Sequence, residues 1–279
     1  IWGVFEKDYL KDRGFVKPTS SWTFKDVNSE RGSEAFINVG FDKRVFPKPK
    51  PIGTIRRTLE VGTSKDKSDI ILDFFSGSAS TGHAVMELSS VDNGNRKYIQ
   101  VQIPEPTPED SYARKIGYET ISQIGIDRIK KTAKKIKEET NADIDYGFRV
   151  YRLDSSNMQD VYYKPQDYTQ ENIDLFADNV KPDRSADDLL AQVMLDWGLP
   201  LSLKIDQVDV LGKKVFKVAG NSLYACFDSG IDEDFAKAIA QDEPLRIVFK
   251  DSGFKNDTAK TNVKQLLKQL SPETEMKVL

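Results

Sequence analysis

The pattern of hydrophobic and polar positions changes along the chain between short apolar runs and helical spacing. The run Ile70–Leu72 is continuously apolar and ends at Asp73, which is typical of a buried parallel strand. The small residues Ser76–Ser80 follow and predict a tight turn into a helix over Thr81–Leu88. Such a turn directs unpaired backbone N–H groups toward the carboxyl end of the strand, where open α/β sheets bind their ligands.

Regular elements are also predicted on both sides of this turn. Helical spacing favours helices over Ile52–Gly62 and Tyr118–Thr140, and Arg96–Ile103 is predicted to form a second strand. The order helix, strand, helix, strand, helix indicates consecutive parallel βαβ units with right-handed crossovers. The strands account for about half of a typical doubly wound sheet. Residues 1–45 carry isolated aromatic side chains without a strong period, so we expect an irregular segment there.

A domain boundary is expected near Asn141–Tyr146, and residues 146–279 predict a second, smaller α/β domain. Two of its strands flank Ala219–Asn221, a hairpin signature. The polar stretch Asp160–Ala177 is expected to form a loop. The strands of this domain are predicted over Phe148–Leu153, Lys213–Val218, Ser222–Phe227 and Leu245–Lys250, and its helices over Asp187–Trp197, Ile231–Ala240 and Thr258–Leu270.

Composition narrows the class of protein. The 279 residues are 38% hydrophobic and 30% charged, which fits a protein with packed cores. No apolar run approaches the roughly 18 residues of a membrane helix, and the first residues lack the apolar region of a signal peptide. The single cysteine, Cys226, excludes an internal disulfide and a cysteine-cluster metal site. We therefore expect a cytoplasmic protein without a metal.

The net charge of −3 does not indicate a nucleic-acid-binding protein, but basic residues gather locally in Lys43–Arg57 and Arg128–Lys137. We interpret Arg128–Lys137 as a solvated helix face, with phosphate contact as the alternative. The only histidine, His83, follows the turn by one helical turn, and we interpret it as a packing residue rather than a general base.

Two stretches carry a family resemblance. Phe46–Lys50 reads FPKPK, and Asp73–Thr81 reads DFFSGSAST. In this order they resemble motifs X and I of the DNA amino-methyltransferases of the beta arrangement, in which PKP precedes a turn of the form D-x-F-x-G-S-x-x-T. Further stretches, among them YGFRVYRLDSSN and PLRIVFKDSGF, resemble the methylation (Mod) subunit of type III restriction–modification systems. The chain as a whole resembles the C-terminal half of that subunit.

The resemblance implies a partial Rossmann-like S-adenosylmethionine methyltransferase sheet over residues 46–140. Residues 1–45 would follow the target-recognition region, and the C-terminal α/β domain of residues 146–279 would serve subunit assembly. Asp73 and the turn would face the methionine part of the cofactor, and either Gln102 or Glu105 would hold its ribose hydroxyls. This assignment requires Phe46–Pro49 to lie close to Gly77. The implied cofactor-binding residues are Phe46, Pro47, Lys48, Pro49, Asp73, Phe74, Phe75, Ser76, Gly77, Ser78 and Gln102.

The resemblance also implies methyl transfer to adenine N6 in DNA. The implied partners are DNA, a second Mod subunit and the restriction (Res) subunit, with no membrane. Relatives hold the flipped base with an Asp-Pro-Pro-Tyr-like tetrapeptide, whose Asp and backbone carbonyl accept the amine hydrogens while the Tyr stacks on the base. No two prolines are adjacent in this sequence. We therefore expect no catalytic residue in this chain, and a chain that is inactive alone.

Other functions remain to be weighed against this one. The alternative is an assembly module that joins Mod to Mod or to Res without binding a cofactor. A nicotinamide dehydrogenase is disfavoured, because no G-x-G-x-x-G follows the first strand. A phosphate-binding P-loop is excluded, because no Gly-Lys-Ser/Thr sequence occurs.

Overall fold

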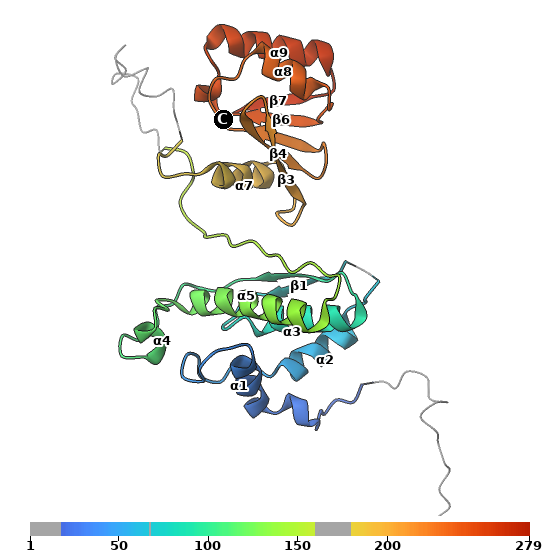
Figure 1. Cartoon of the computed structure of the whole chain (residues 1–279), viewed down its shortest axis with the longest axis vertical. Helices are drawn as coiled ribbons and strands as arrows, with labels where there is room; N and C mark the ends of the chain where they lie inside the picture. The colour runs from blue at the N-terminus through green and yellow to red at the C-terminus, as the bar shows by residue number, and fades with distance from the viewer. Residues whose placement is uncertain (1–17, 67, 160–179) are drawn as a thin grey trace, which may run out of the picture. The chain divides into compact units, whose positions relative to one another are not determined.

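The computed structural model describes residues 18–66, 68–159 and 180–279. The chain divides into two compact units, the first ending at Arg152 and the second beginning at Leu153. Both units combine helices with a sheet, so the predicted α/β class is confirmed (Figure 1). The loop expected over Asp160–Ala177 and the first part of the segment 1–45 lie outside the described residues.

The first unit contains a two-stranded parallel sheet and helices on one side of it. Its two strands are joined through α3, which is the βαβ order predicted from the sequence. In chain order the elements are η1 (Lys25–Val27), α1 (Ser29–Asn38), α2 (Ile52–Gly62), β1 (Ile70–Asp73), α3 (Ser80–Asp92), β2 (Lys97–Gln100), α4 (Tyr112–Lys115) and α5 (Ile121–Thr140).

The described residues cover only one face of this sheet. Ile71 and Tyr98 point to the covered face and pack against buried residues of α2 and α3. The sequence predicted both strands, but the prediction that the run Ile70–Leu72 is buried throughout is wrong, because α2, α3 and α5 all lie on the same side. The exposed large apolar side chains of the opposite face are Ile70, Leu72, Ile99 and Val101.

The long helix α5 shows how the sequence sets an element. Thr120 and Gln123 form a capping box that satisfies the first N–H groups of the helix. Ile124, Ile129 and Ile136 recur at helical spacing and are buried against the rest of the unit. The helix ends where Asn141 adopts a left-handed backbone conformation. In Figure 1, α5 lies beside α3, and the two helices are in contact.

The expectation of an irregular segment over residues 1–45 is wrong for α1. The side chain of Asn28 accepts a hydrogen bond from the Glu30 N–H and so begins the helix. Phe36 is fully buried and stacks on Phe41 with 4.3 Å between ring centroids. The helix makes only a few turns and buries one aromatic side chain, so its period is too short to stand out in the sequence.

The second unit contains a five-stranded mixed sheet in the order β3-β4-β5-β6-β7. Pairing is antiparallel from β3 to β5 and parallel from β5 to β7. The hairpin turn between β4 and β5 places Ala219 and Gly220 at positive φ. In chain order the elements are α7 (Ala186–Asp196), β3 (Ile205–Val210), β4 (Lys213–Val218), β5 (Leu223–Cys226), α8 (Glu233–Ala240), β6 (Arg246–Phe249), η4 (Asp251–Gly253), α9 (Asp257–Leu270) and β7 (Glu275–Val278).

Helices cover both faces of this second sheet. One core cluster joins Phe235 of α8 and Val263 of α9 to Phe249 of β6. The other joins Val193 and Met194 of α7 to the opposite face of the sheet. The predicted hairpin and all three predicted helices of this domain are confirmed within one or two residues at their ends, whereas β3 and β7 were not predicted. The strand predicted over Phe148–Leu153 is wrong, because these residues have no paired neighbour strand.

Candidate functional site

The turn after β1 begins with an ordered carboxylate. Asp73 Oδ1 accepts a hydrogen bond from the Phe75 N–H at 3.2 Å, and Asp73 Oδ2 accepts one from Thr81 Oγ1 at 2.6 Å. The carboxylate therefore ties the end of the strand to the first turn of α3. Because an ionised carboxylate has about four acceptor positions, it retains capacity for a further donor.

The backbone of the turn is left-handed at two positions. Gly77 has φ of +52° and Ala79 has φ of +58°. Ala79 is the N-cap residue of α3 and makes no side-chain capping hydrogen bond. The α3 N-terminus thus presents backbone N–H groups without a side-chain cap, as an anion-binding helix start does.

The residues just after β2 place Gln102 against this turn. Gly77 N–H donates to Gln102 Oε1 at 2.7 Å, and Ser76 N–H donates to the Val101 carbonyl at 3.1 Å. The amide nitrogen of Gln102 donates to the Ile103 carbonyl. Gln102 therefore lies against the turn with both ends of its amide engaged, whereas the alternative residue Glu105 has an exposed side chain and pairs through its backbone with Ile121.

The segment Phe46–Pro49 reaches the same turn through its first residue. A Cβ atom added to Gly77 would lie 3.7 Å from Cζ of Phe46, so the Phe46 ring borders the turn directly. Pro49 is buried, while Pro47 and Lys48 are exposed. The structure thus brings Phe46, Gly77 and Gln102 together, as the resemblance requires, but not the side chains of Pro47 and Lys48.

Of the remaining predicted residues, some are exposed and others are engaged within the turn. Phe74 and Phe75 are 61% and 80% exposed, and their rings contact each other with 4.9 Å between centroids. The Ser76 carbonyl accepts from the Ala79 N–H inside the turn. Ser78 is buried, and its hydroxyl accepts a hydrogen bond from the Arg128 guanidinium.

Sequence reasoning missed Arg128. Its guanidinium is completely buried and donates to the Ser78 hydroxyl at 2.9 Å and to the Ser80 hydroxyl at 2.8 Å. Burial lowers the pKa of Arg128 to about 10. The interpretation of Arg128–Lys137 as a solvated face is confirmed for Lys134, which forms an exposed i,i+4 pair with Glu138, but it is wrong for Arg128.

Two glycines that no motif marks bring helices close to the site. A Cβ on Gly125 of α5 would lie 3.3 Å from the Gly77 carbonyl oxygen, so α5 meets the turn at a position without a side chain. A Cβ on Gly32 of α1 would lie only 1.8 Å from the Pro49 carbonyl oxygen. A glycine inside a predicted helix is the signal that could have found the contact of Gly125, whereas no helix was predicted around Gly32.

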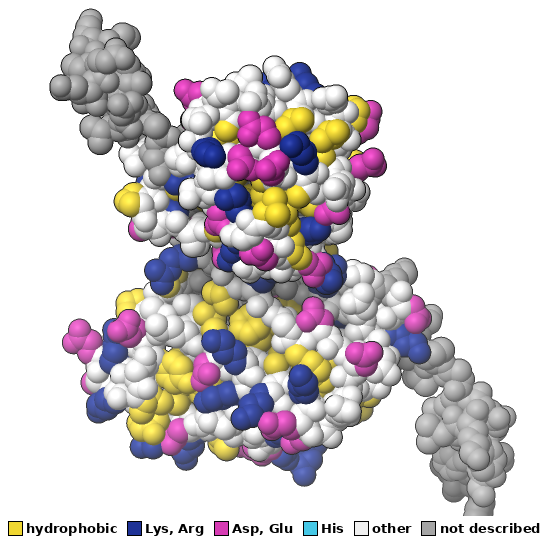
Figure 2. Space-filling view, turned by 45° about the horizontal axis from the view of Figure 1, so that its top comes forward, with side chains coloured by type: hydrophobic (Ala, Val, Ile, Leu, Met, Phe, Trp, Pro, Cys, Tyr) yellow, Lys and Arg dark blue, Asp and Glu magenta, His cyan; other side chains and the backbone are white. Residues whose placement is uncertain are grey.

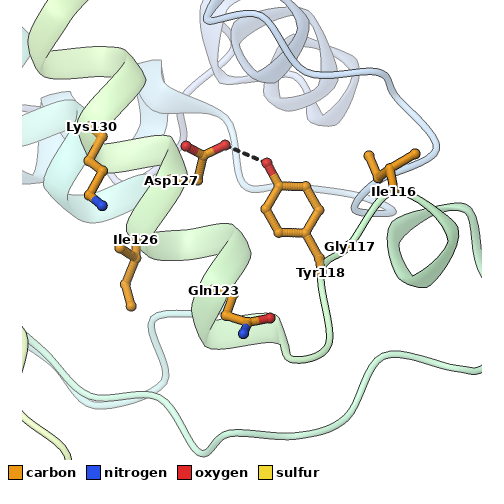
Figure 3. A pocket seen from close by; sticks show the side chains of 7 residues that line it. All are labelled: Ile116, Gly117, Tyr118, Gln123, Ile126, Asp127 and Lys130. Atoms are coloured by element: carbon orange, nitrogen blue, oxygen red, sulfur yellow. Dashed lines mark hydrogen bonds between the residues drawn. The ribbon is translucent and has the colours of Figure 1, made fainter.

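The first unit also has an open cavity away from this turn. Its volume is about 410 Å³, and Figure 3 shows the Tyr118 hydroxyl pointing toward Asp127 of α5, to which it donates a hydrogen bond. Burial and this hydrogen bond raise the pKa of Tyr118. None of the predicted cofactor residues lines this cavity, so it is separate from the candidate site.

The surface of the first unit is mixed in charge and polarity. Figure 2 shows Lys and Arg side chains on the visible face of the first unit, with Asp and Glu side chains and apolar side chains among them. In the part of the chain that the structure describes, no helix is long and apolar enough to cross a membrane. The same residues contain no group of three or more His, Cys, Asp or Glu side chains that could hold a metal ion.

Comparison with known proteins defines the class. Residues 5–138 match a family of DNA methylases. Among curated relatives, the chain is 33% identical over 146 residues to the type III restriction-modification enzyme StyLTI Mod subunit of Salmonella typhimurium, an alignment that covers 51% of this chain and 22% of the relative. The resemblance to type III Mod subunits is therefore confirmed, and residues 5–138 are similar to the DNA methylases.

Two further relatives extend the match into the second unit. The EcoP15I Mod subunit of Escherichia coli is 31% identical over 234 residues, covering 77% of this chain and 33% of the relative. The EcoPI Mod subunit of Escherichia phage P1 is 28% identical over 255 residues, covering 86% of this chain and 37% of the relative. The chain thus spans about a third of the length of these two Mod subunits.

Proposed function

We propose that this chain binds S-adenosylmethionine at the turn Asp73–Ala79 and is the cofactor-binding part of a site-specific DNA adenine-N6 methyltransferase of the type III restriction–modification class. The observation that carries the proposal is the convergence at Gly77. The Phe46 ring borders Gly77, and the Gln102 amide accepts its N–H. Three segments far apart in the sequence therefore meet where an α/β sheet binds ligands.

The residues at the turn fit the chemical groups of this cofactor. The uncapped N-terminus of α3 suits the carboxylate of the methionine part, and the remaining acceptor positions of Asp73 suit its ammonium group. The Phe46 ring offers an apolar, π-rich surface for the cofactor. Gln102 is the residue that we expect to hydrogen-bond the ribose hydroxyls, because its amide lies against the turn. When bound, the cofactor supplies the methyl group, and these residues would hold and orient it.

The exposed face of β1 and β2 supports a division of the reaction between this chain and further protein. Ile70, Leu72 and Ile99 leave apolar surface open on a parallel sheet that has two strands among the described residues of the first unit. Parallel sheets are ordinarily covered on both faces. Together with the missing tetrapeptide, this supports a Rossmann-like sheet whose catalytic strands come from outside this chain, and a chain that is inactive alone.

A calorimetric titration with S-adenosylmethionine tests the cofactor site. We expect binding by the unchanged chain, and we expect Gly77→Val to weaken it at least about tenfold, because valine is strained at positive φ and would crowd Phe46. Gly117→Val is the matched control, because Gly117 also has positive φ in the first unit but no atom lies within 4 Å of its Cβ position. Equal loss in both variants, or no binding by the unchanged chain, would contradict the proposal.

A methyl-transfer assay tests the division of labour. We expect no methyl transfer when the chain is mixed with labelled S-adenosylmethionine and duplex DNA, because the sequence contains no tetrapeptide to hold the flipped base. Turnover by the chain alone would show that the missing part has been assigned wrongly. DNA, a second Mod subunit and a Res subunit are the partners proposed for the complete enzyme, which we place in the cytoplasm.

The assembly module remains the second candidate function. The second unit has its own two-sided core and so does not depend on a cofactor for its fold. We propose that this unit serves contacts with Mod or Res. A chain that binds such a subunit but gives no heat with S-adenosylmethionine would favour the assembly module over the methyltransferase part.

A further inference from the structure

The guanidinium of Arg128 lies directly beneath the turn proposed to bind the cofactor. Besides the hydroxyls of Ser78 and Ser80, it contacts the Ser78 carbonyl at 3.3 Å. The face of Phe36 lies 5.3 Å from the guanidinium carbon. Nη2 of Arg128 lies 3.3 Å from Nδ1 of His83 on α3. One side chain of α5 thus holds both ends of the serine pair that leads into α3.

This arrangement is unusual for a buried cation. Arg128 is 0% exposed, and among the described residues it forms no salt bridge with a carboxylate. Removing a charge from water costs free energy unless a counter-ion is paired with it. Its hydrogen-bond partners are instead neutral groups of the turn and of His83, so the cation is placed to order this turn rather than to join an ion pair.

The contacts of His83 determine its protonation. An arginine side chain can only donate, so Nδ1 of His83 must accept and cannot carry a proton. The other ring nitrogen, Nε2, then carries the proton and donates to Glu87 Oε1 at 2.9 Å. The neutral imidazole therefore links the Glu87 carboxylate to the Arg128 guanidinium.

We propose that Arg128 is a positioning residue for the cofactor turn, and that neutral His83 is the acceptor that keeps Arg128 in place. This inference rests on the proposed cofactor role of the turn. Protonation of His83 would replace the acceptor by a second cation facing Arg128. The turn Ser78–Ser80 would then lose its support, and cofactor affinity would fall with decreasing pH.

Charged groups from three helices face His83. Glu87 on α3 is its hydrogen-bond partner. The positive charges of Arg128 and Lys135 on α5 lower the pKa of His83. Arg56 of α2 lines the same cavity as His83.

Burial is the largest influence and lowers the pKa of His83 below its ordinary value of 6.5, against the opposing pull of Glu87. Glu139 of α5 also lines this cavity. For Glu87, burial alone would raise its pKa, but the hydrogen bond from His83 and nearby cations lower it overall.

The sign of the pH effect follows from these contacts. A base whose pKa is lower in the folded state binds fewer protons there than in the unfolded chain. Stability is therefore unaffected above pH 6.5 and is lost as the pH falls from 6.5 toward the lower folded value. The turn itself is expected to lose its support only as the pH falls through the lowered pKa of His83 in the folded protein, which lies below 6.5.

Hydrogen exchange measured by mass spectrometry tests the positioning role without any cofactor. We expect Arg128→Met to speed exchange in the peptide of the turn at least about fivefold, with little change in the C-terminal turns of α3. Lys130→Met, at an exposed position of the same helix, is the matched control. If Arg128→Met does not fold, Ser80→Ala removes one acceptor without changing α5. Unchanged exchange in the turn of a folded variant would overturn the proposal.

Variants at His83 separate the titration from packing alone. His83→Asn keeps a neutral acceptor near the position of Nδ1, so its turn should stay protected from exchange as the pH falls through the lowered pKa of folded His83, where the turn of the unchanged protein loses protection. His83→Phe keeps a ring but offers no acceptor, so its turn should exchange fast at every pH. Equal pH profiles for the unchanged protein and His83→Asn would overturn the role of His83.

Cofactor titrations then distinguish the two proposals. If the unchanged chain does not bind S-adenosylmethionine, the proposed function fails, while the exchange experiment still decides whether Arg128 orders the turn. If the unchanged chain binds and both Arg128→Met and Ser80→Ala bind equally well, the positioning role is wrong, although the cofactor site stands. We expect these variants to weaken binding about tenfold or more, with Lys130→Met unchanged.

Discussion

The two sheets of this chain differ in how they are covered. In the second unit, helices pack on both faces, and all four residues of β5 are buried. In the first unit, β1 alternates between exposed and half-buried residues, because the described helices pack on one face only. A sheet that is covered on both sides can be stable by itself, whereas a two-stranded sheet depends strongly on what packs against it.

The difference teaches what the apolar pattern of β1 encodes. Ile70, Ile71 and Leu72 are apolar on both faces of the strand, which is the pattern of a strand covered on two sides. The structure provides cover for Ile71 but leaves Ile70 and Leu72 about 60% exposed. This mismatch supports the proposal that further protein completes the first sheet. The second sheet shows no such mismatch, because helices cover both of its faces.

The largest expected effect is in the closed core of the second unit. Phe249 is 0% exposed and makes edge contacts with the rings of Phe235 and Phe254. We expect Phe249→Ala to lower the free energy of unfolding of this unit by about 3–5 kcal/mol, because truncation leaves a cavity. Denaturant unfolding followed by the fluorescence of Trp197, with Trp2 and Trp22 replaced by phenylalanine, would measure it.

The matched control is Phe75, an exposed aromatic residue of the first unit. Phe75 is 80% exposed, so Phe75→Ala is expected to change the free energy of unfolding by less than about 0.5 kcal/mol. Comparable losses in the two variants would mean that Phe75 is packed in solution, and the contrast between the two sheets would not hold.

A smaller effect is expected where α1 holds the segment Phe46–Pro49. Gly32→Ala would place a Cβ 1.8 Å from the Pro49 carbonyl oxygen, so backbone must move. We expect a loss of about 1–3 kcal/mol in the free energy of unfolding of the first unit, by analogy with overpacked cores. Cofactor affinity should fall as well, because Phe46 borders Gly77.

Gly62→Ala provides the control for helix propensity. Gly62 ends α2 and has no atom within 4 Å of its Cβ position, so alanine there should be neutral or stabilising by up to about 1 kcal/mol. If Gly32→Ala were equally neutral, α1 would not be held tightly against Pro49, and this contact could not position the candidate site.

Much of the fold could be predicted from the sequence because its signals are local. The bounds of α2 are those predicted, and the hairpin around Gly220 follows from its turn residues. The strands β3 and β7 escaped prediction because they are half-buried and lack a continuous apolar run. The exposure of Leu72 could not be predicted, because it depends on whether other parts of the fold cover that face of the sheet and not on the sequence of the strand.

The candidate site was predictable only where a resemblance marked it. The two motifs named Phe46 and Gly77, the resemblance offered Gln102 as one of two ribose partners, and the structure brings these three residues together. Arg128 was hidden, because its charge in a lysine-rich helix favours an exposed position and only the tertiary structure turns it under Ser78. Long-range contacts of this kind leave no periodic signal in a single sequence.

The smallest effect on stability, and the sharpest test of the uncovered sheet, is expected at Leu72. Leu72 lies opposite Ile99 on the exposed face. We expect Leu72→Thr to change the free energy of unfolding by less than about 0.5 kcal/mol, since threonine is tolerated in strands and little burial is lost. Self-association measured by sedimentation velocity should decrease, because contiguous exposed apolar surface promotes association.

The control for this variant is Leu245→Thr in the second unit, where Leu245 is 55% exposed and immediately precedes β6. It should leave self-association unchanged, because the sheet beside it is covered on both faces by helices. If Leu72→Thr destabilised the first unit by about 2 kcal/mol or more, its side chain would be buried in solution, since losses of that size require a packed site. The first sheet would then be complete within this chain, and the catalytic strands would not need to come from outside it.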